Sequence, residues 1–257
     1  MQPGTSERSS LAELLVGDFG VVADIALWWL SSRTIPDYVL PGPLAVGQRM
    51  AGLLTDLEFL QNALLSITRI AFSLTIAMML GTALALLPFY RPASTSVIDR
   101  VILPFFNSFP SLGWVLLATI WFNVSEFTVT FIQVAILLPF CLVNVAEGVR
   151  VLDADTLEMG RSFTSRQRRM FFRIMLPLLL PYLVGSLRIS YGVAWKIALL
   201  AELFGARSGV GYVMLQAQVV GDSVTVLSTC LFIVVFFAMG DWLVIRPLAR
   251  HFGEVRK

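Results

Sequence analysis

Long apolar runs, separated by short polar or charged segments, dominate the chain. A helix needs about 20 largely apolar residues to cross roughly 30 Å of hydrocarbon, and six runs approach that length. They predict membrane-spanning helices at about residues 15–31, 63–89, 101–122, 127–148, 177–204 and 224–244. The first run is short and contains Asp18 and Asp24, which favours a helix packed on its neighbours or lying partly in the interface. The pattern predicts an all-α, polytopic membrane protein with one transmembrane domain over residues 15–248.

Composition agrees with this pattern. Of the 257 residues, 57% are hydrophobic and 14% are charged, whereas soluble domains average about 25% charged. These values exclude an ordinary cytosolic enzyme, a disordered chain and a nucleic-acid-binding protein. Cys141 and Cys230 lie in apolar runs, and His251 is the single histidine, so we expect no metal site. The N-terminal segment lacks the pattern of a cleaved signal peptide.

The placement of basic residues predicts an orientation. Thirteen of the 19 lysines and arginines lie in the two tails and the even-numbered loops, and three lie on the opposite side. The other three fall within predicted spans. Because cytoplasmic loops carry the excess of basic residues, we expect both termini, residues 1–14 and 249–257, to be cytoplasmic.

The longest cytoplasmic connection, residues 149–176, mixes charged and apolar side chains. Asp153, Asp155 and Glu158 come first, where a helix start favours negative charge, and arginines interleaved with apolar residues follow. Such a mixture suits short helices that lie against a protein partner. A loop that only fixes the topology is the alternative interpretation.

This connection resembles the EAA loop of ABC importer permeases. The matching residues are Glu158-Met159-Gly160, Thr164, Ile174 and Leu176-Pro177, at the spacing of that family. Five flanking segments resemble the nitrate, sulfonate, taurine and bicarbonate branch: Leu40-Pro41-Gly42-Pro43 with Val46, Ser66-Ile67-Thr68-Arg69, Gly148-Val149-Arg150, Gly185-Ser186-Leu187-Arg188, and Ala201-Glu202 with Gly205 to Tyr212. Met159 and Gly160 replace the two alanines of the pattern, and Thr164 replaces its glycine. A threonine disfavours positive φ, so either the bend at Thr164 uses a conformation open to a β-branched residue or the break lies elsewhere.

The resemblance implies the type I permease fold, with six transmembrane helices, in a bacterial inner membrane. It also implies a homodimer, a pair of ABC ATPase subunits that bind ATP and magnesium, and an extracytoplasmic substrate-binding protein. The residues expected to couple to the ATPase are Asp155, Glu158, Met159, Gly160, Phe163, Thr164, Arg166, Arg169, Ile174 and Pro177, with Phe163 as the side chain buried in the ATPase.

An ATPase domain within this chain is not expected. A phosphate-binding loop ends in Gly-Lys-Ser/Thr, and neither Lys196 nor Lys257 follows a glycine. We therefore expect no enzymatic activity and no cofactor bound by this chain.

Ionisable residues within spans are costly and usually face a partner or an aqueous path. Lys196, Arg188 and Arg69 are therefore candidates for the translocation path, and Trp195 is a further candidate as the neighbour of Lys196. Alternatives are snorkelling or an ion pair for Lys196, packing for Trp195 and Arg188, and interface anchoring or a structural pair for Arg69.

The glycine-rich run 205–212 predicts a tight outer turn. By the resemblance, this turn contacts the binding protein or forms an outer gate, and the candidates are Glu202, Gly205, Gly209, Gly211 and Tyr212. Glu202 has the alternative of pairing with Lys196.

Together these features predict the permease subunit of an ATP-driven importer for a small anionic solute, such as nitrate, bicarbonate, a sulfonate, taurine or an organic acid. The same machinery for a thiamine precursor, riboflavin or an aromatic solute is one alternative. A self-sufficient secondary transporter or channel is another, although the chain shows no inverted repeat. A membrane scaffold with no transport role is a third.

Overall fold

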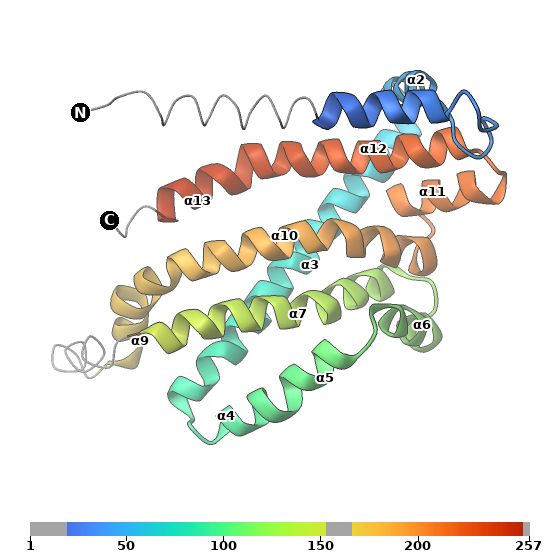
Figure 1. Cartoon of the computed structure of the whole chain (residues 1–257). Coiled ribbons are helices and arrows are strands. Elements are labelled where there is room, and N and C mark those ends of the chain that lie inside the picture. The colour runs from blue at the N-terminus through green and yellow to red at the C-terminus, as the bar shows by residue number, and fades with distance from the viewer. Residues whose placement is uncertain (1–19, 153–165, 254–257) are drawn as a thin grey trace, which may run out of the picture. The chain divides into compact units, whose positions relative to one another are not determined.

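The computed structural model describes residues 20–152 and 166–253, and all regular structure in these residues is helical (Figure 1). An apolar helix at Gly20–Ser31 precedes the labelled elements. These are α2 (Pro43–Leu53), α3 (Leu57–Tyr90), α4 (Ser94–Val97), η1 (Ile98–Ile102), α5 (Leu103–Ser108), α6 (Ser111–Phe122), α7 (Glu126–Val151), α9 (Gln167–Met170), η2 (Phe171–Met175), α10 (Leu176–Gly205), α11 (Val210–Val219), α12 (Ser223–Gly240), η3 (Asp241–Ile245) and α13 (Arg246–Gly253).

Four helices of the described residues are long and apolar enough to cross a membrane: Leu57–Tyr90, Glu126–Val151, Arg168–Gly205 and Ser223–Phe252. Three of them extend well past the predicted spans, because the sequence ranges follow hydropathy while the helices continue into polar flanks. The first predicted span, 15–31, lies partly outside the described residues.

The predicted span 101–122 differs most from the structure. It is broken at Pro110, where Ser94–Ser108 and Ser111–Phe122 meet at 85°. Phe109 is extended, with φ −77° and ψ 123°, as expected for a residue whose α conformation is disfavoured by a following proline. The two pieces form either a fifth, broken span or a re-entrant loop.

Prolines also explain three π-helical turns. The π turns η1, η2 and η3 each end two residues before a proline, at Pro104, Pro177 and Pro247. A proline in a helix removes one backbone donor and clashes with the carbonyl four residues earlier. A local π turn relieves that clash without ending the helix.

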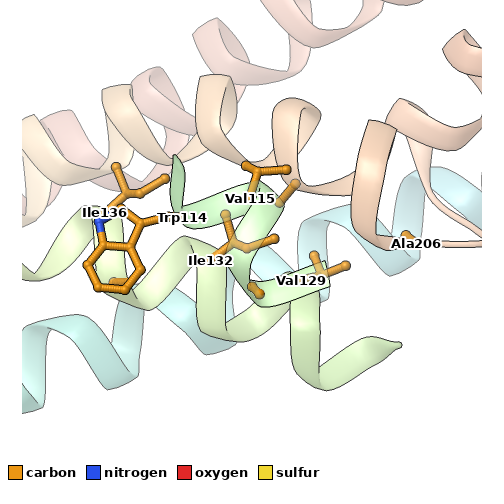
Figure 2. Close-up of a cluster of buried hydrophobic side chains, with 9 residues drawn as sticks. Trp114, Val115, Val129, Ile132, Ile136 and Ala206 are labelled. Carbon is orange, nitrogen blue, oxygen red and sulfur yellow. The ribbon is translucent and has the colours of Figure 1, made fainter. Parts of the chain in front are cut away.

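The chain forms two compact units, and the larger comprises residues 58–213 and 233–257. In it α7 and α10 run side by side, and α6 packs against both (Figure 1). Trp114 and Val115 of α6 pack with Val129 and Ile132 of α7 and with Ala206 in one core cluster (Figure 2).

Close helix contacts in this unit depend on glycine. A Cβ on Gly81 of α3 would lie 2.7 Å from the Cβ of Cys141 in α7. A Cβ on Gly148 of α7 would lie 2.5 Å from the ring of Tyr182 in α10. Because packed interiors leave no spare volume, these glycines set the distances between α7 and its two neighbours.

Among the described residues, the smaller unit comprises 20–57 and 214–232. Here α2 packs on the first half of α12: Ser228 donates to the carbonyl of Val46 at 3.0 Å, and Nε of Arg49 donates to Thr225 at 2.8 Å. Asp222 caps α12 by accepting from the backbone N–H of Thr225 at 3.0 Å. Partial burial alone would raise the pKa of Asp222, but the Thr225 hydrogen bonds and the charge of Arg49 hold this pKa below its usual value.

Candidate functional site

The predicted ATPase-contact residues are only partly within the described chain. Asp155, Glu158, Met159, Gly160, Phe163 and Thr164 lie outside it. Of the other four, Arg166, Arg169 and Pro177 are exposed, and Ile174 is half-buried.

The arginine-rich end of this connection and the following span form one continuous helix. It runs from Arg168 through η2 and α10 to Gly205, over 38 residues. At 1.5 Å per residue this is about 57 Å, well beyond the roughly 30 Å of hydrocarbon. The helix therefore links a basic segment at one end mechanically to the Gly205 turn at the other.

A buried ion-pair network lies at the Gly205 end. Nη1 of Arg69 in α3 is 3.0 Å from Oε1 of Glu202 in α10, and both side chains are at most 5% exposed. Nε of Arg69 donates to Glu126 at 2.7 Å, and Nη2 pairs with the same carboxylate. Ser208 accepts through its carbonyl at 2.9 Å and its hydroxyl at 2.7 Å. All five guanidinium N–H groups are thus engaged.

This arrangement bears on the two roles predicted for Arg69. In the structure Arg69 forms the structural pair that was its alternative, and all of its N–H donors are engaged with protein acceptors. Glu202, a candidate for contact with the binding protein or, as an alternative, for a pair with Lys196, forms an ion pair with Arg69 and is 1% exposed.

Glu202 also fixes the outer turn. Its carboxylate accepts from Ser66 of α3 at 2.8 Å and from the backbone N–H of Gly211 at 2.9 Å. Ser66 accepts from the N–H of Val210 at 2.8 Å, and Asn62 accepts from the N–H of Gly209 at 2.6 Å. Three successive backbone donors of the turn are therefore held by α3 and α10.

Glycine is required in this turn for two reasons. Gly209 has φ +102°, and a Cβ there would overlap the carboxyl group of Glu202, so both the conformation and the space exclude a side chain. A Cβ on Gly211 would lie 2.6 Å from the Cβ of Glu202. Gly205, Gly209 and Gly211 are buried and Tyr212 is half-buried, which suits a gate better than a direct docking surface.

Sequence reasoning missed Asn62, Ser66, Glu126 and Ser208. A signal for two of them was present: Asn62 and Ser66 precede Arg69 by seven and three residues, so the three share one face of a largely apolar helix. No local signal marks Glu126 or Ser208, which reach Arg69 from elsewhere in the chain.

Two other candidate path residues lie on a different face of α10. Arg188 and Lys196 are exposed, with Gly185 and Ile189, and the spacing of three, four and seven residues places these positions on one helix face. Lys196 is nine residues, about 14 Å, from Gly205. Trp195 is buried in a cluster with Leu137 and Ala194, the packing that was the alternative prediction for this side chain.

Comparison with known proteins agrees with this architecture. Residues 73–246 match the family described as the binding-protein-dependent transport system inner membrane component. The chain belongs to this family. The permease is also 26% identical to the taurine transport system permease protein TauC of Escherichia coli, over 79% of this chain and 76% of that protein.

Other similar proteins include the putative aliphatic sulfonates transport permease protein SsuC of Bacillus subtilis, 26% identical over 76% of this chain and 71% of that protein. The bicarbonate transport system permease protein CmpB of Synechococcus elongatus is 25% identical over 82% of this chain and 79% of that protein.

These matches confirm the predicted branch and the type I permease fold. The permease is a multi-pass membrane component of an ABC importer and not an enzyme. Its family works with an ABC ATPase and a substrate-binding protein.

Proposed function

We propose that this permease forms, with a second copy of itself, the path for a small anionic solute in an ATP-driven importer. The observation that carries the proposal is the exposed cationic face of α10, defined by Gly185, Arg188, Ile189 and Lys196. This face lies within a helix long and apolar enough to span the membrane.

Exposed cations inside a membrane are unfavourable. A charged side chain near the bilayer centre costs roughly 2.5–3.5 kcal/mol on insertion scales, and such residues face a partner or a water-filled cavity. Neither Arg188 nor Lys196 has an ion pair in the described residues. A second copy that encloses an aqueous path along this face would supply the missing environment.

A symmetric pair suits the same face. In a two-fold dimer one surface patch meets its own copy, so two copies of α10 would bring four cations to one path. No neighbouring atom lies within 4 Å of the Cβ position of Gly185, and small residues allow membrane helices to approach closely.

The solute class follows from this charge and from the relatives. Relatives of the permease are described as carrying taurine, aliphatic sulfonates and bicarbonate. All of these bear an anionic group, which a cationic path attracts. We propose a small anion of this kind as the solute, delivered by the binding protein.

Coupling to ATP is proposed for the basic end of the long helix. The predicted docking segment, Asp155 to about Arg173 with Phe163 as the buried side chain, would dock on the ATPase, which binds ATP and magnesium. The excess of basic residues at this end predicts that it is cytoplasmic, with both termini on the same side. Closure of the ATPase pair would move the helix from Arg168 to Gly205 as a rigid lever, and the Arg69–Glu202 network would receive that motion at the outer turn.

Uptake into vesicles tests the proposed path. The full assembly of permease, ATPase and binding protein is supplied with labelled taurine, an aliphatic sulfonate or bicarbonate. Lys196→Met is expected to lower the maximal rate at least about tenfold, on the order of 1.4 kcal/mol of lost charge stabilisation, whereas Lys196→Arg retains it. Arg207→Met, which removes an exposed charge from the outer turn, is the matched control. Normal uptake by Lys196→Met would remove the argument.

A further inference from the structure

Two polar side chains in the larger unit, one in α3 and one in α7, are completely buried. Ser73 and Gln133 are each 0% exposed. Among the described residues, neither the hydroxyl of Ser73 nor the amide nitrogen and oxygen of Gln133 has a hydrogen-bond partner. A buried polar group without a hydrogen bond costs free energy, and the bilayer core contains no bulk water to supply one. These three atoms therefore call for a partner that the packed helices do not provide.

A close contact between the two helices places both side chains at one level of the α3–α7 interface. The helices run in the same direction (Figure 1), and Gly81 of α3 lies against Cys141 of α7. Ser73 precedes Gly81 by eight residues, and Gln133 precedes Cys141 by eight. The two offsets are equal, about 12 Å along each helix, so Ser73 and Gln133 lie side by side in height.

This level separates the ion-pair network from the apolar core. The Arg69–Glu202 network begins one turn before Ser73 in α3. One turn further along α3 and α7, Ala77 and Leu137 belong to one buried apolar cluster. The two polar side chains thus form a layer between the network that holds the outer turn and the core below it.

The third helix at this level limits the size of any occupant. Ala198 of α10 lies one turn before Glu202 and belongs to the same apolar cluster. Ser73, Gln133 and Ala198 are at most 3% exposed. An occupant between α3, α7 and α10 is therefore enclosed and small.

The unpartnered atoms also select the chemistry of the occupant. Gln133 presents donors on Nε2 and an acceptor at Oε1, and the Ser73 hydroxyl both donates and accepts. An anion would accept from Nε2 but leave Oε1 without a donor, and a cation would do the reverse. Water donates and accepts, and buried waters typically make about three hydrogen bonds to groups that the protein leaves unsatisfied.

We infer that ordered water occupies the junction of α3, α7 and α10 and bridges the Gln133 amide to the Ser73 hydroxyl, one helical turn from the Arg69–Glu202 network. Water-mediated hydrogen bonds are nearly as favourable as direct ones, so the bridge holds α3 against α7 at a level where direct hydrogen bonds are missing. The inference rests on the described helices alone and not on the proposed solute.

Electron cryomicroscopy of the assembled permease and ATPase tests this site, at a resolution that shows ordered water elsewhere in the map. Without added solute, we expect a separate density within about 2.7–3.2 Å of polar atoms of both Gln133 and Ser73. The absence of that density, or a direct hydrogen bond between the two side chains, would overturn the inference. Density that appears only with added taurine or bicarbonate would do so too, because it would assign the site to the solute.

A double-variant cycle supplies an independent measurement. The folding equilibrium constants of Ser73→Ala, Gln133→Met and the double variant are determined by unfolding the full permease in mixed micelles. Removing one side chain leaves the other without its bridge, whereas removing both leaves neither. The constant of the double variant should therefore exceed the value expected from independent effects by about fivefold, the worth of one net hydrogen bond.

A matched cycle controls for the general effect of the substitution. Gln61→Met, at an exposed position of α3, replaces Gln133→Met and should combine with Ser73→Ala without coupling. Independent effects in both cycles would show that Ser73 and Gln133 share no water and would overturn the inference.

Discussion

The Arg69–Glu202 pair is the feature whose removal should most affect the fold. The Glu202 side chain is 1% exposed. In Arg69→Met its carboxylate keeps the hydrogen bonds from Ser66 and Gly211 but loses its cation. Removing one partner of a buried ion pair typically costs about 3–5 kcal/mol, because the remaining charge is uncompensated. We expect Arg69→Met to lower the free energy of unfolding by that amount.

The neighbouring carboxylates provide a graded comparison. Glu126→Gln should cost about 0–1 kcal/mol, because the Glu126 side chain is 70% exposed and exposed pairs contribute little. Glu202→Gln removes the buried charge and leaves Arg69 paired with Glu126, so it should cost less than Arg69→Met. The double variant Arg69→Met with Glu202→Gln should be more stable than the sum of the two single losses predicts, by about 1–3 kcal/mol.

The assay is reversible unfolding in mixed micelles, titrated with a denaturing detergent and followed by tryptophan fluorescence. Additive losses in the double variant, or a loss for Arg69→Met no larger than that for Glu126→Gln, would show that the pair is not coupled in the folded protein.

Three further variants test the close contacts and the helix cap. Gly209→Ala should cost about 2–4 kcal/mol, from positive φ and overpacking, whereas Gly47→Ala, with open space around its Cβ, should be neutral or stabilising by up to about 1 kcal/mol; thermal unfolding compares them. Gly148→Ala should cost about 1–3 kcal/mol, and Tyr182→Ala in the same chain should recover part of this loss if the 2.5 Å contact is its cause. Asp222→Ala should cost about 0.5–2 kcal/mol near neutral pH. The folded pKa of Asp222 lies below its usual 3.8, so the wild type keeps its full excess in free energy of unfolding over the variant above pH 3.8. That excess is lost as the pH falls through the lower folded pKa. An excess that grows on acidification would contradict the cap.

Hydropathy predicted much of the fold. The apolar runs located the long helices, because burial in lipid requires continuous apolar length. Their ends were less predictable: Arg168–Met175 extends the fifth helix beyond the predicted start at 177, since helix geometry continues through polar residues that hydropathy assigns to a loop. The break at Pro110 was missed because prolines are tolerated within membrane helices, and only packing decides whether one bends.

The site was predictable only in part. Arg69, Lys196 and Glu202 were identified as unusual because ionisable residues are rare within spans. Their partners were not, since Arg69 and Glu202 are 133 positions apart and helix periodicity describes faces, not which faces meet. Lys196 and Trp195 are adjacent in sequence, yet one is exposed and the other buried, a difference that only the packing of α10 reveals.

The central claim is that ATP drives the transport of an anionic solute along the cationic face of α10. It is tested most directly by the reaction of Lys196→Cys, in a Cys141→Ser and Cys230→Ser background, with an anionic water-soluble thiol reagent in the assembled permease and ATPase. The labelling rate should exceed that of Phe72→Cys, which is 60% exposed on α3. It should also change when ATP and magnesium are added, and stay constant when the ATPase is omitted. A rate equal to that of Phe72→Cys and unaffected by ATP would contradict the account.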